Sequence, residues 1–296
     1  MTIATAAPDR TGWKDALTSE RAAKITSLIV FLVGWQILSL FHTRVPGPWP
    51  VVEFLWTELT GGSHGGAATG EFWEHFLLTV QRFLIGLAIG FTGGLIAGVL
   101  VGSFPLMKAL FNDTVLVLLT LPAIIWAFLT VMWFGIDWKA PVLTVALASA
   151  PFVAVNIAQG VRAIPHDLHD MSTAFDVPWS RRVRHLIVAG VMGYLFAGLR
   201  FAVIIGWNGI LLSEWFSGQA GVGHRARYWY DANRYRGFLG WVVLFIGFIV
   251  LLDRLVLSRL QNRAFRWRHP AGEATAAEDL AQAMEDVEEG ETAWRP

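Results

Sequence analysis

Long apolar blocks of membrane-spanning length constrain the fold of this chain more than any other sequence feature. Hydrophobic residues make up 54% of the sequence and charged residues only 16%. Because a helix of about 20 apolar residues crosses the hydrocarbon layer, these blocks predict transmembrane helices rather than a soluble core. The predicted spans are 22–41, 83–104, 110–134, 140–160, 188–212 and 238–257. We therefore predict an all-α membrane protein with six transmembrane helices.

The spans occupy the middle of the chain and leave polar ends. We predict a cytoplasmic N-terminal segment over 1–21, a six-span domain over 22–258 and an acidic tail over 259–296. The tail is rich in Ala and Glu and nearly lacks aromatic residues, which favours a flexible, solvated segment. No small-x-small cleavage pattern follows the first apolar block, so we interpret that block as an uncleaved anchor. A short interfacial helix is expected at 51–59.

The second span carries a line of glycines spaced four residues apart. The glycine line consists of Gly86, Gly90, Gly94, Gly98 and Gly102. Glycines at this spacing share one helix face and let a neighbouring backbone approach closely. We therefore favour tight helix packing over a direct role in solute binding. Pro122, Pro141 and Pro151 lie inside later spans, where a proline frees backbone groups and marks an irregular helix.

A polar island at 161–187 separates the fourth and fifth spans. Pro165 fits the opening of a helix, because proline loses no hydrogen bond in the first turn. Leu168, Met171 and Phe175 then recur at helical spacing and make one apolar stripe. We predict two short amphipathic helices that lie on the membrane surface, where a soluble partner can bind them. We refer to 161–187 as the platform.

Lysine and arginine are distributed unequally between the two sides of the predicted membrane. The side with both termini, the Lys108 loop and the platform carries more of them than the opposite side. The positive-inside rule therefore places both termini and the platform in the cytoplasm. His166 and His169 lie three residues apart, but no third ligand is near, so we predict no metal site. We expect no cofactor, no nucleic acid partner and, without a Walker A pattern, no ATP hydrolysis by this chain.

The platform resembles the EAA loop of ATP-binding-cassette (ABC) importer permeases, the loop that docks on the ATPase subunit. Asp170-Met171-Ser172 stands at the family's acidic-Ala-Ala position, and Asp176 stands where the family has a glycine. A glycine there supplies a positive φ, which an aspartate tolerates with some strain. Val188-Ala189 replaces the Leu-Pro that closes the family motif.

The resemblance extends over about 46–260. The further segments that carry it are 70–86, 121–136, 150–165, 194–202 and 213–224. The overall pattern is similar to the subfamily that imports sulfonates, taurine, nitrate or related small anions. The resemblance implies a permease subunit in the bacterial inner membrane that forms the pathway for such a solute.

The resemblance also implies an assembly. Two permease subunits, here a homodimer, would share the pathway, two ATPase subunits would bind ATP, and an extracytoplasmic binding protein would deliver the solute. The residues expected to couple to the ATPase are Pro165, Leu168, Asp170, Met171, Phe175, Asp176, Arg181 and Arg182. An apolar stripe on a short helix suits a groove in a soluble partner. Contact with anionic lipid is an equally good interpretation of the arginines.

Polar residues inside or beyond the later spans are candidates for the pathway. Arg200 lies within the fifth span, where a charge is costly unless it is paired or hydrated, so we expect it to face the bundle interior. A structural role for Arg200 is an equally good interpretation. Asn156, Asn208 and Glu214 are the other candidates, the last two at the outer gate. Near the outer mouth, Arg225, Arg227, Arg234 and Arg236 would steer anions or dock an acidic binding protein.

Two other classes of protein compete with this interpretation. A secondary carrier would use the platform for regulation, but carriers usually show internal repeats and paired intramembrane acids. Neither half of the chain repeats the other, and we expect no Asp or Glu deep in a span. A membrane anchor that transports nothing is the third possibility, and it would explain the departures from the family's loop motif.

Overall fold

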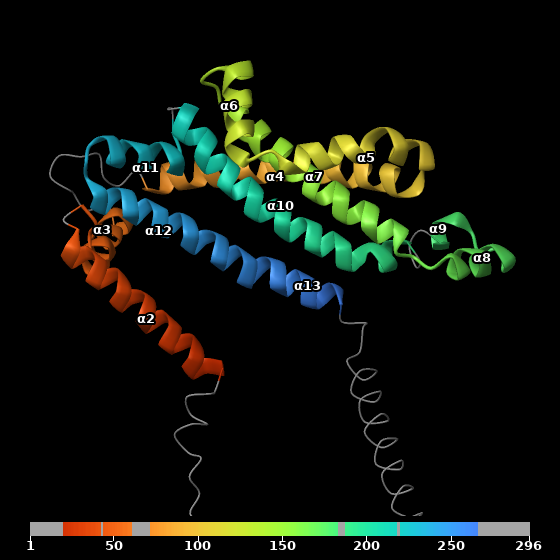
Figure 1. Cartoon of the computed structure of the whole chain (residues 1–296), viewed down its shortest axis with the longest axis horizontal. Coiled ribbons are helices and arrows are strands. Elements are labelled where there is room, and N and C mark those ends of the chain that lie inside the picture. The colour runs from red at the N-terminus through yellow and green to blue at the C-terminus, as the bar shows by residue number, and fades with distance from the viewer. Residues whose placement is uncertain (1–19, 43, 61–71, 183–186, 218–219, 266–296) are drawn as a thin grey trace, which may run out of the picture.

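The computed structural model of the chain describes residues 20–42, 44–60, 72–182, 187–217 and 220–265, which form helices and no strand (Figure 1). Five continuous helices are long and apolar enough to cross a membrane. They are α2 (Glu20–Phe41), α4 (Phe72–Ser103), α7 (Lys139–Arg162), α10 (Val188–Ser217) and a last stretch made of α12 (Tyr235–Leu252), the π-helical turn η2 (Asp253–Leu257) and α13 (Ser258–Ala264). The predicted all-α membrane fold is confirmed.

The predicted third span, 110–134, is broken at Pro122, where the sequence indicates an irregular helix. The structure has α5 (Pro105–Thr120) and α6 (Ala123–Phe134), which are bent by 98° relative to each other. Pro122 has no backbone N–H to donate, and the residue before a proline avoids the helical region. Leu121 accordingly adopts φ −69° and ψ 123°. The bent pair makes the sixth span if its two halves are counted together.

Helix α7 forms the centre of the bundle, since 67% of its most apolar window is buried. Helices α4 and α10 pack along it (Figure 1). The glycine line of α4 faces α7: a Cβ added at Gly94 would lie 2.7 Å from the Cβ of Val153, and one at Gly98 would lie 2.7 Å from the Cβ of Ile157. Such distances are shorter than carbon atoms tolerate, so only glycine permits this approach. The predicted tight packing is confirmed.

Short helices occupy the two ends of the bundle (Figure 1). Helices α8 (His166–Ala174) and α9 (Trp179–Arg182) lie beyond α7 at one end. Helices α3 (Pro48–Thr60) and α11 (Val222–Asp231) lie at the opposite end, where α11 connects α10 to α12. Helix α3 confirms the short helix predicted at 51–59. The bundle therefore carries one small helical unit on each side of its spans.

Helix α2 stands apart from the bundle (Figure 1). None of its apolar window is buried against the rest of the described chain. It is attached near its C-terminal end, where Trp35 Nε1 donates a 3.0 Å hydrogen bond to the carbonyl of Pro46. Residues 1–19 of the predicted N-terminal segment and 266–296 of the predicted tail lie outside the described residues, whereas α13 continues the last span to Ala264.

Candidate functional site

The platform is attached to the bundle by a buried isoleucine. Ile164 is 7% exposed and packs in one cluster with Ile157 of α7 and Val191 of α10. Pro165 follows as the N-cap residue of α8, where the sequence predicts a helix to open. Ser172 of α8 is also buried. This attachment fixes the position of α8 and leaves most of its side chains exposed.

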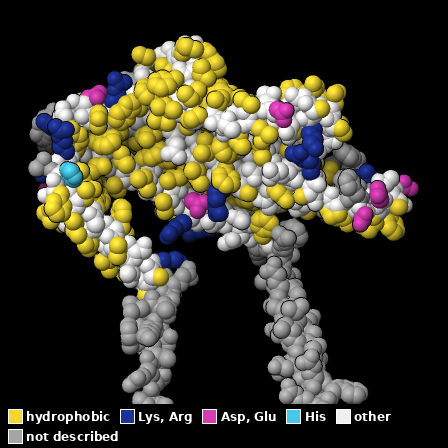
Figure 2. All heavy atoms as spheres, in the orientation of Figure 1, with side chains coloured by type: hydrophobic (Ala, Val, Ile, Leu, Met, Phe, Trp, Pro, Cys, Tyr) yellow, Lys and Arg dark blue, Asp and Glu magenta, His cyan; other side chains and the backbone are white. Residues whose placement is uncertain are grey.

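The apolar stripe of α8 is exposed. Leu168, Met171 and Phe175 are 37%, 52% and 77% exposed, respectively. Asp170 is exposed on the same short helix. Figure 2 shows hydrophobic and acidic side chains intermixed at this end of the molecule. Large apolar side chains that remain uncovered on a polar surface helix indicate an interaction surface.

Helix α8 ends in a Schellman turn built around Asp176. The backbone N–H of Asp176 donates to the carbonyl of Thr173 at 3.0 Å, and that of Val177 donates to the carbonyl of Ser172 at 3.0 Å. Asp176 has φ 47°, the left-handed conformation that glycine usually adopts at this position. The structure therefore forms the turn that the resemblance implies, with an aspartate in place of the glycine.

A new helix, α9, begins immediately after Pro178. The carbonyl of Pro178 accepts hydrogen bonds from the backbone N–H groups of Arg181 at 2.9 Å and Arg182 at 3.0 Å. Arg182 Nη2 also donates a 3.2 Å hydrogen bond to Thr173 Oγ1, which joins α9 to α8. Arg181 is exposed. Residues 183–186, which continue the basic run, lie outside the described residues.

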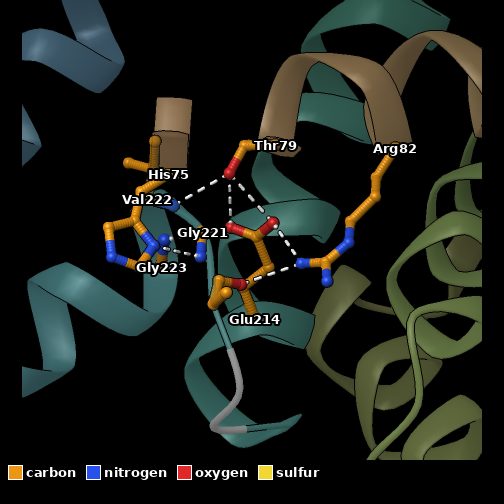
Figure 3. A network of polar contacts seen from close by, with 8 residues as sticks. His75, Thr79, Arg82, Glu214, Gly221, Val222 and Gly223 are labelled. Atoms are coloured by element: carbon orange, nitrogen blue, oxygen red, sulfur yellow. Dashed lines mark hydrogen bonds and ion pairs between the residues drawn. The ribbon is translucent and has the colours of Figure 1, made fainter. Parts of the chain in front are cut away.

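A buried polar network lies at the opposite end of the bundle (Figure 3). Glu214 of α10 is fully buried, and its carboxylate accepts hydrogen bonds from Thr79 Oγ1 at 2.9 and 2.8 Å. Arg82 Nη1 lies 3.1 Å from Glu214 Oε1 and forms an ion pair with it. Glu214 therefore joins α10 to α4, and the prediction that it lines an outer gate is wrong for this structure because no part of it reaches the surface.

The network also holds residues 220–223, which lead into and begin α11 and which we call the strap. Arg82 Nη1 donates a 2.8 Å hydrogen bond to the carbonyl of Ala220. Backbone N–H groups of the strap donate to side chains: Gly221 to His75 Nδ1 at 3.0 Å, Val222 to Thr79 Oγ1 at 2.8 Å and Gly223 to Glu214 Oε2 at 3.1 Å. Gly221 has φ 120°, and a Cβ there would overlap with the Glu214 carboxyl group. The strap thus fits closely around the Glu214 carboxyl group.

A second buried ion pair fixes α11 to α3. Arg225 Nη2 lies 3.7 Å from Glu58 Oε1, and both side chains are at most 5% exposed. The guanidinium carbon of Arg225 also lies 5.1 Å from the ring centre of Tyr228 and 5.9 Å from that of Trp229. The predicted role of Arg225 in steering anions from solvent is therefore wrong, because burial and pairing remove its charge from the surface.

The intramembrane arginine has an acidic partner that the sequence analysis missed. Arg200 Nε donates a 2.8 Å hydrogen bond to Asp253 Oδ1, and the two side chains are 43% and 38% exposed. Asp253 is the first residue of η2, and its backbone carbonyl accepts a hydrogen bond from Ser258 Oγ at 2.9 Å. Because Asp253 lies inside the last long apolar stretch, Tyr235–Ala264, the expectation of no acidic residue deep in a span is wrong for that span.

The two asparagines predicted along the pathway bond to their own helices. Asn156 Nδ2 donates to the carbonyl of Phe152 at 2.8 Å, and Asn208 Nδ2 donates to the carbonyl of Ile204 at 3.0 Å. Asn208 is exposed, whereas Asn156 is half-buried beside Gly198. Their predicted role in the pathway stays a prediction.

The three remaining arginines of the predicted outer group lie in two different places. Arg227 pairs with Asp231 at 3.3 Å and donates a 2.9 Å hydrogen bond to the carbonyl of Trp215. Arg234 and Arg236 are exposed and line a pocket between α2, α3 and the start of α12. The structure therefore does not gather the four arginines around one opening.

The partners that sequence reasoning missed are His75, Thr79, Glu58 and Asp253. Thr79 and Glu214 are 135 residues apart in the sequence, so no local spacing connects them. Among the described residues, no group of three or more His, Cys, Asp or Glu side chains could hold a metal ion. The side chains of His166 and His169 lie outside that description.

The fold and these sites define a multi-pass helical membrane protein with an exposed short helix beyond its spans, as in transport permeases. A family model described as "binding-protein-dependent transport system inner membrane component" matches residues 90–267. This match covers more than half of the chain. The protein therefore belongs to the family of inner membrane components of binding-protein-dependent transport systems.

The curated relatives are permeases of ABC importers. The chain is 30% identical over 241 residues to the aliphatic sulfonates transport permease SsuC of Escherichia coli, covering 79% of this chain and 84% of SsuC. It is 26% identical over 241 residues to the nitrate import permease NrtB of Synechococcus elongatus, covering 78% and 86%. The taurine transport permease TauC of Escherichia coli is 23% identical over 267 residues, covering 87% and 94%.

Solved structures share the fold. A chain of the MetNI methionine ABC transporter in an inward-facing conformation matches with a TM-score of 0.53 and 17% identity, covering 72% of this chain and 98% of that chain. A chain of an amino acid ABC transporter also matches with a TM-score of 0.53, at 18% identity and with 65% and 93% coverage. At this identity the likeness concerns the fold alone.

Proposed function

We propose that the protein forms the translocation pathway of an ATP-driven importer for a small oxyanion such as a sulfonate, taurine or nitrate. The family match and the named activities of the relatives support this proposal. The single observation in the structure that carries it is the exposed stripe of α8. A short helix anchored by Ile164, with its apolar side chains uncovered, is what a separate motor subunit needs in order to move the spans.

In the proposed assembly, two ATPase subunits dock on two copies of this chain. Leu168, Met171 and Phe175 of each copy enter a hydrophobic groove in the ATPase, as an amphipathic helix does in helix-in-groove recognition. Asp170 and Arg181 lie exposed on the same platform and supply charged contacts at the rim. ATP binds to the ATPase, so this chain needs no nucleotide site and catalyses no hydrolysis.

The proposed orientation places the platform in the cytoplasm. The basic residues near the platform and the ends of the chain support this placement through the positive-inside rule. The strap and α11 then face the opposite side, where an extracytoplasmic binding protein delivers the solute. The protein is an inner membrane component by family, and both termini lie in the cytoplasm in this arrangement.

The ion pair between Arg200 and Asp253 is the best candidate for a pathway group. Both side chains lie in long apolar helices and remain more than a third exposed in the isolated chain. Exposed intramembrane charges face a protein interior or a water-filled cavity, because contact with lipid costs several kcal/mol. In the homodimer, the surface of α10 and η2 that carries this pair therefore faces the shared interior and not the lipid.

The decisive experiment measures binding of the chain, in detergent or nanodiscs, to the ATPase subunit of its own transport system. The wild type is compared with Met171→Arg, which places a charge in the apolar stripe. Asn262→Arg on α13 is the matched control, since it adds the same side chain to another exposed helix near the same end of the spans. We expect Met171→Arg to weaken binding by about 100-fold and the control to bind as the wild type does.

Other outcomes of this experiment identify the competing functions. Equal binding by the wild type and Met171→Arg would move the docking surface away from α8. A complete absence of binding to any ATPase would favour the secondary carrier or the membrane anchor. Uptake of labelled sulfonate, taurine and nitrate by cells that contain the whole system then distinguishes a carrier from an anchor, because an anchor supports no uptake. The same measurement identifies the solute.

A further inference from the structure

A basic pocket lies between α2, α3 and the junction of α11 with α12, at the end of the bundle opposite the platform. Its volume is about 500 Å³. Its walls include Ser39 near the end of α2, Phe54 of α3 and Trp229 of α11. Arg44, Arg234 and Arg236 also line it, and among its described lining residues none is acidic. The pocket therefore combines three positive charges with aromatic walls.

The three guanidinium groups have no partner within the described residues. No hydrogen bond or ion pair is formed there by the side chain of Arg44, Arg234 or Arg236. This separates them from Arg225 and Arg227, which are both paired. Three arginines that line one pocket without a counter-charge among its described lining residues favour an anion in it.

Hydrogen bonds of the backbone fix the turn that contains Arg234. Helix α11 ends in a Schellman turn in which Asn233 N–H donates to the carbonyl of Tyr230 at 2.9 Å and Arg234 N–H donates to the carbonyl of Trp229 at 3.0 Å. Asn233 has φ 55°, and its Oδ1 accepts a 3.0 Å hydrogen bond from Tyr235 Oη. The turn thus fixes the backbone on both sides of Arg234, one of the three arginines that line the pocket.

The surroundings of the pocket are those of a membrane interface. Helix α2 leads away from the pocket with its apolar window unburied, and its last residues Leu40 and Phe41 are 75% and 79% exposed. Trp49 and Trp56 of the adjacent α3 are 75% and 71% exposed. Exposed tryptophans beside the end of a span mark the level of the lipid headgroups. A ligand in this pocket has apolar helix surface on one side and water on the other.

We infer that this pocket binds the phosphate-bearing headgroup of an anionic phospholipid. Arginine forks match the geometry of phosphate oxygens, and clustered basic side chains at a membrane surface attract anionic lipid headgroups. The acyl chains would extend along the exposed apolar face of α2. A free oxyanion shares the phosphate chemistry, but it would leave this apolar face unused. The lipid therefore joins α2 to the bundle at a place where few protein contacts do so.

The test is the retention of phosphatidylglycerol by the full chain in native mass spectrometry from detergent. The variant Arg44→Gln/Arg234→Gln/Arg236→Gln removes the three charges of the pocket, and Arg254→Gln/Arg259→Gln/Arg263→Gln removes three exposed charges elsewhere. We expect the pocket variant to retain phosphatidylglycerol about 10-fold less than the wild type, and the control variant to retain it normally. Phosphatidylethanolamine, which is zwitterionic, should be retained weakly by all three proteins.

A charge-preserving variant protects the test against misfolding. Arg44→Lys/Arg234→Lys/Arg236→Lys should retain the lipid more strongly than the glutamine variant. Equal loss from the two triple-glutamine variants would overturn the proposal, because the binding would then be unspecific. Displacement of phosphatidylglycerol by inorganic phosphate at equal concentration would also overturn it in favour of a free-anion site. The pocket variant could also retain the lipid normally and yet lose the solute uptake that the binding protein supports. That result would overturn the lipid proposal and would indicate that the binding protein docks on the pocket.

Discussion

Helices α8 and α11 are similar in length, but they lie at opposite ends of the bundle and differ in their contacts with it. Each is a short helix between two spans, and each ends in a Schellman turn with a residue other than glycine in the left-handed conformation, Asp176 in one case and Asn233 in the other. Helix α11 buries Arg225 and Trp229 against the bundle. Helix α8 leaves Phe175 77% exposed. The local turn is the same, and the difference lies in what each helix packs against.

This difference separates a structural helix from a docking helix. The strap is held by contacts within the chain, because Glu214 bonds to Arg82 and to the amide of Gly223, and Arg82 also bonds to the carbonyl of Ala220. In the proposed assembly, the stripe of α8 buries its apolar surface against the ATPase. Substitutions near α11 should therefore lower stability, whereas substitutions in the stripe should lower binding and leave stability unchanged. The predictions below test this division.

The largest effect is expected at the buried ion pair. Glu214→Ala leaves Arg82 charged and unpaired in the interior, which should lower the free energy of unfolding by about 3–5 kcal/mol. The double variant Glu214→Ala/Arg82→Ala should be less damaging than the sum of the single variants, since no unpaired charge remains. The stability of the single and double variants is compared by the fraction of protein that remains monodisperse after heating in detergent. Strict additivity would show that the two residues do not stabilise each other.

A smaller effect is expected at the strap. Gly221→Ala places a methyl group against the Glu214 carboxyl group at φ 120°, and should lower the free energy of unfolding by about 1–3 kcal/mol. Gly93→Ala on α4 is the matched control, because no atom lies within 4 Å of the added Cβ and alanine favours the helix. The same heating assay applies. Equal behaviour of the two variants would mean that the strap does not depend on a close fit.

The ion pair between Arg200 and Asp253 should contribute less to stability than the strap does. Its loss should affect solute uptake more than it affects stability. Asp253→Asn leaves Arg200 unpaired and should destabilise the chain by about 1 kcal/mol. The exchange Arg200→Asp/Asp253→Arg keeps both charges and should recover most of that loss. Solute uptake should stay reduced in the exchanged variant if Arg200 contacts an anion. Full recovery of uptake would assign the pair a purely structural role.

The smallest effects are expected at the two Schellman turns. Glycine relieves the positive φ at Asp176 and at Asn233, with a gain of at most about 1 kcal/mol that the greater freedom of the unfolded chain partly offsets. Asp176→Gly should gain more than Asn233→Gly, because the latter also loses the hydrogen bond from Tyr235 Oη. Thermal unfolding monitored by circular dichroism compares them. The reverse order would mean that the side chain of Asp176 stabilises its turn.

Periodic features could be predicted from the sequence because they lie within one helix. The stripe of Leu168, Met171 and Phe175 and the line of glycines on α4 repeat at helical spacing, so each predicts its own face. The turn at Asp176 could be predicted through the resemblance to a known loop. The chain break at Pro122 was indicated by the proline, but its 98° bend depends on packing against other helices.

The polar contacts could not be predicted because they join residues far apart in the sequence. The partners of each ion pair lie in different helices, as Glu58 and Arg225 or Arg200 and Asp253 do. The sequence around one partner therefore does not identify the other. Asp253 also sits inside an apolar block, where the surrounding hydrophobic residues dominate the pattern. The prediction that Arg225 faces solvent failed for the same reason, since burial depends on which helix packs over it.

The glycine line has a mechanical consequence. Because α4 and α7 touch through their backbones at Gly94 and Gly98, neither helix can slide along the other without a collision, and the two must turn as one rigid body. This body reaches from Thr79 and the strap at one end to the platform at the other. If the ATPase docks on α8 as proposed, a push there would reach the strap by rotation of this body, and sliding would occur at contacts made by side chains, such as those of Trp207 of α10 with Phe245 of α12.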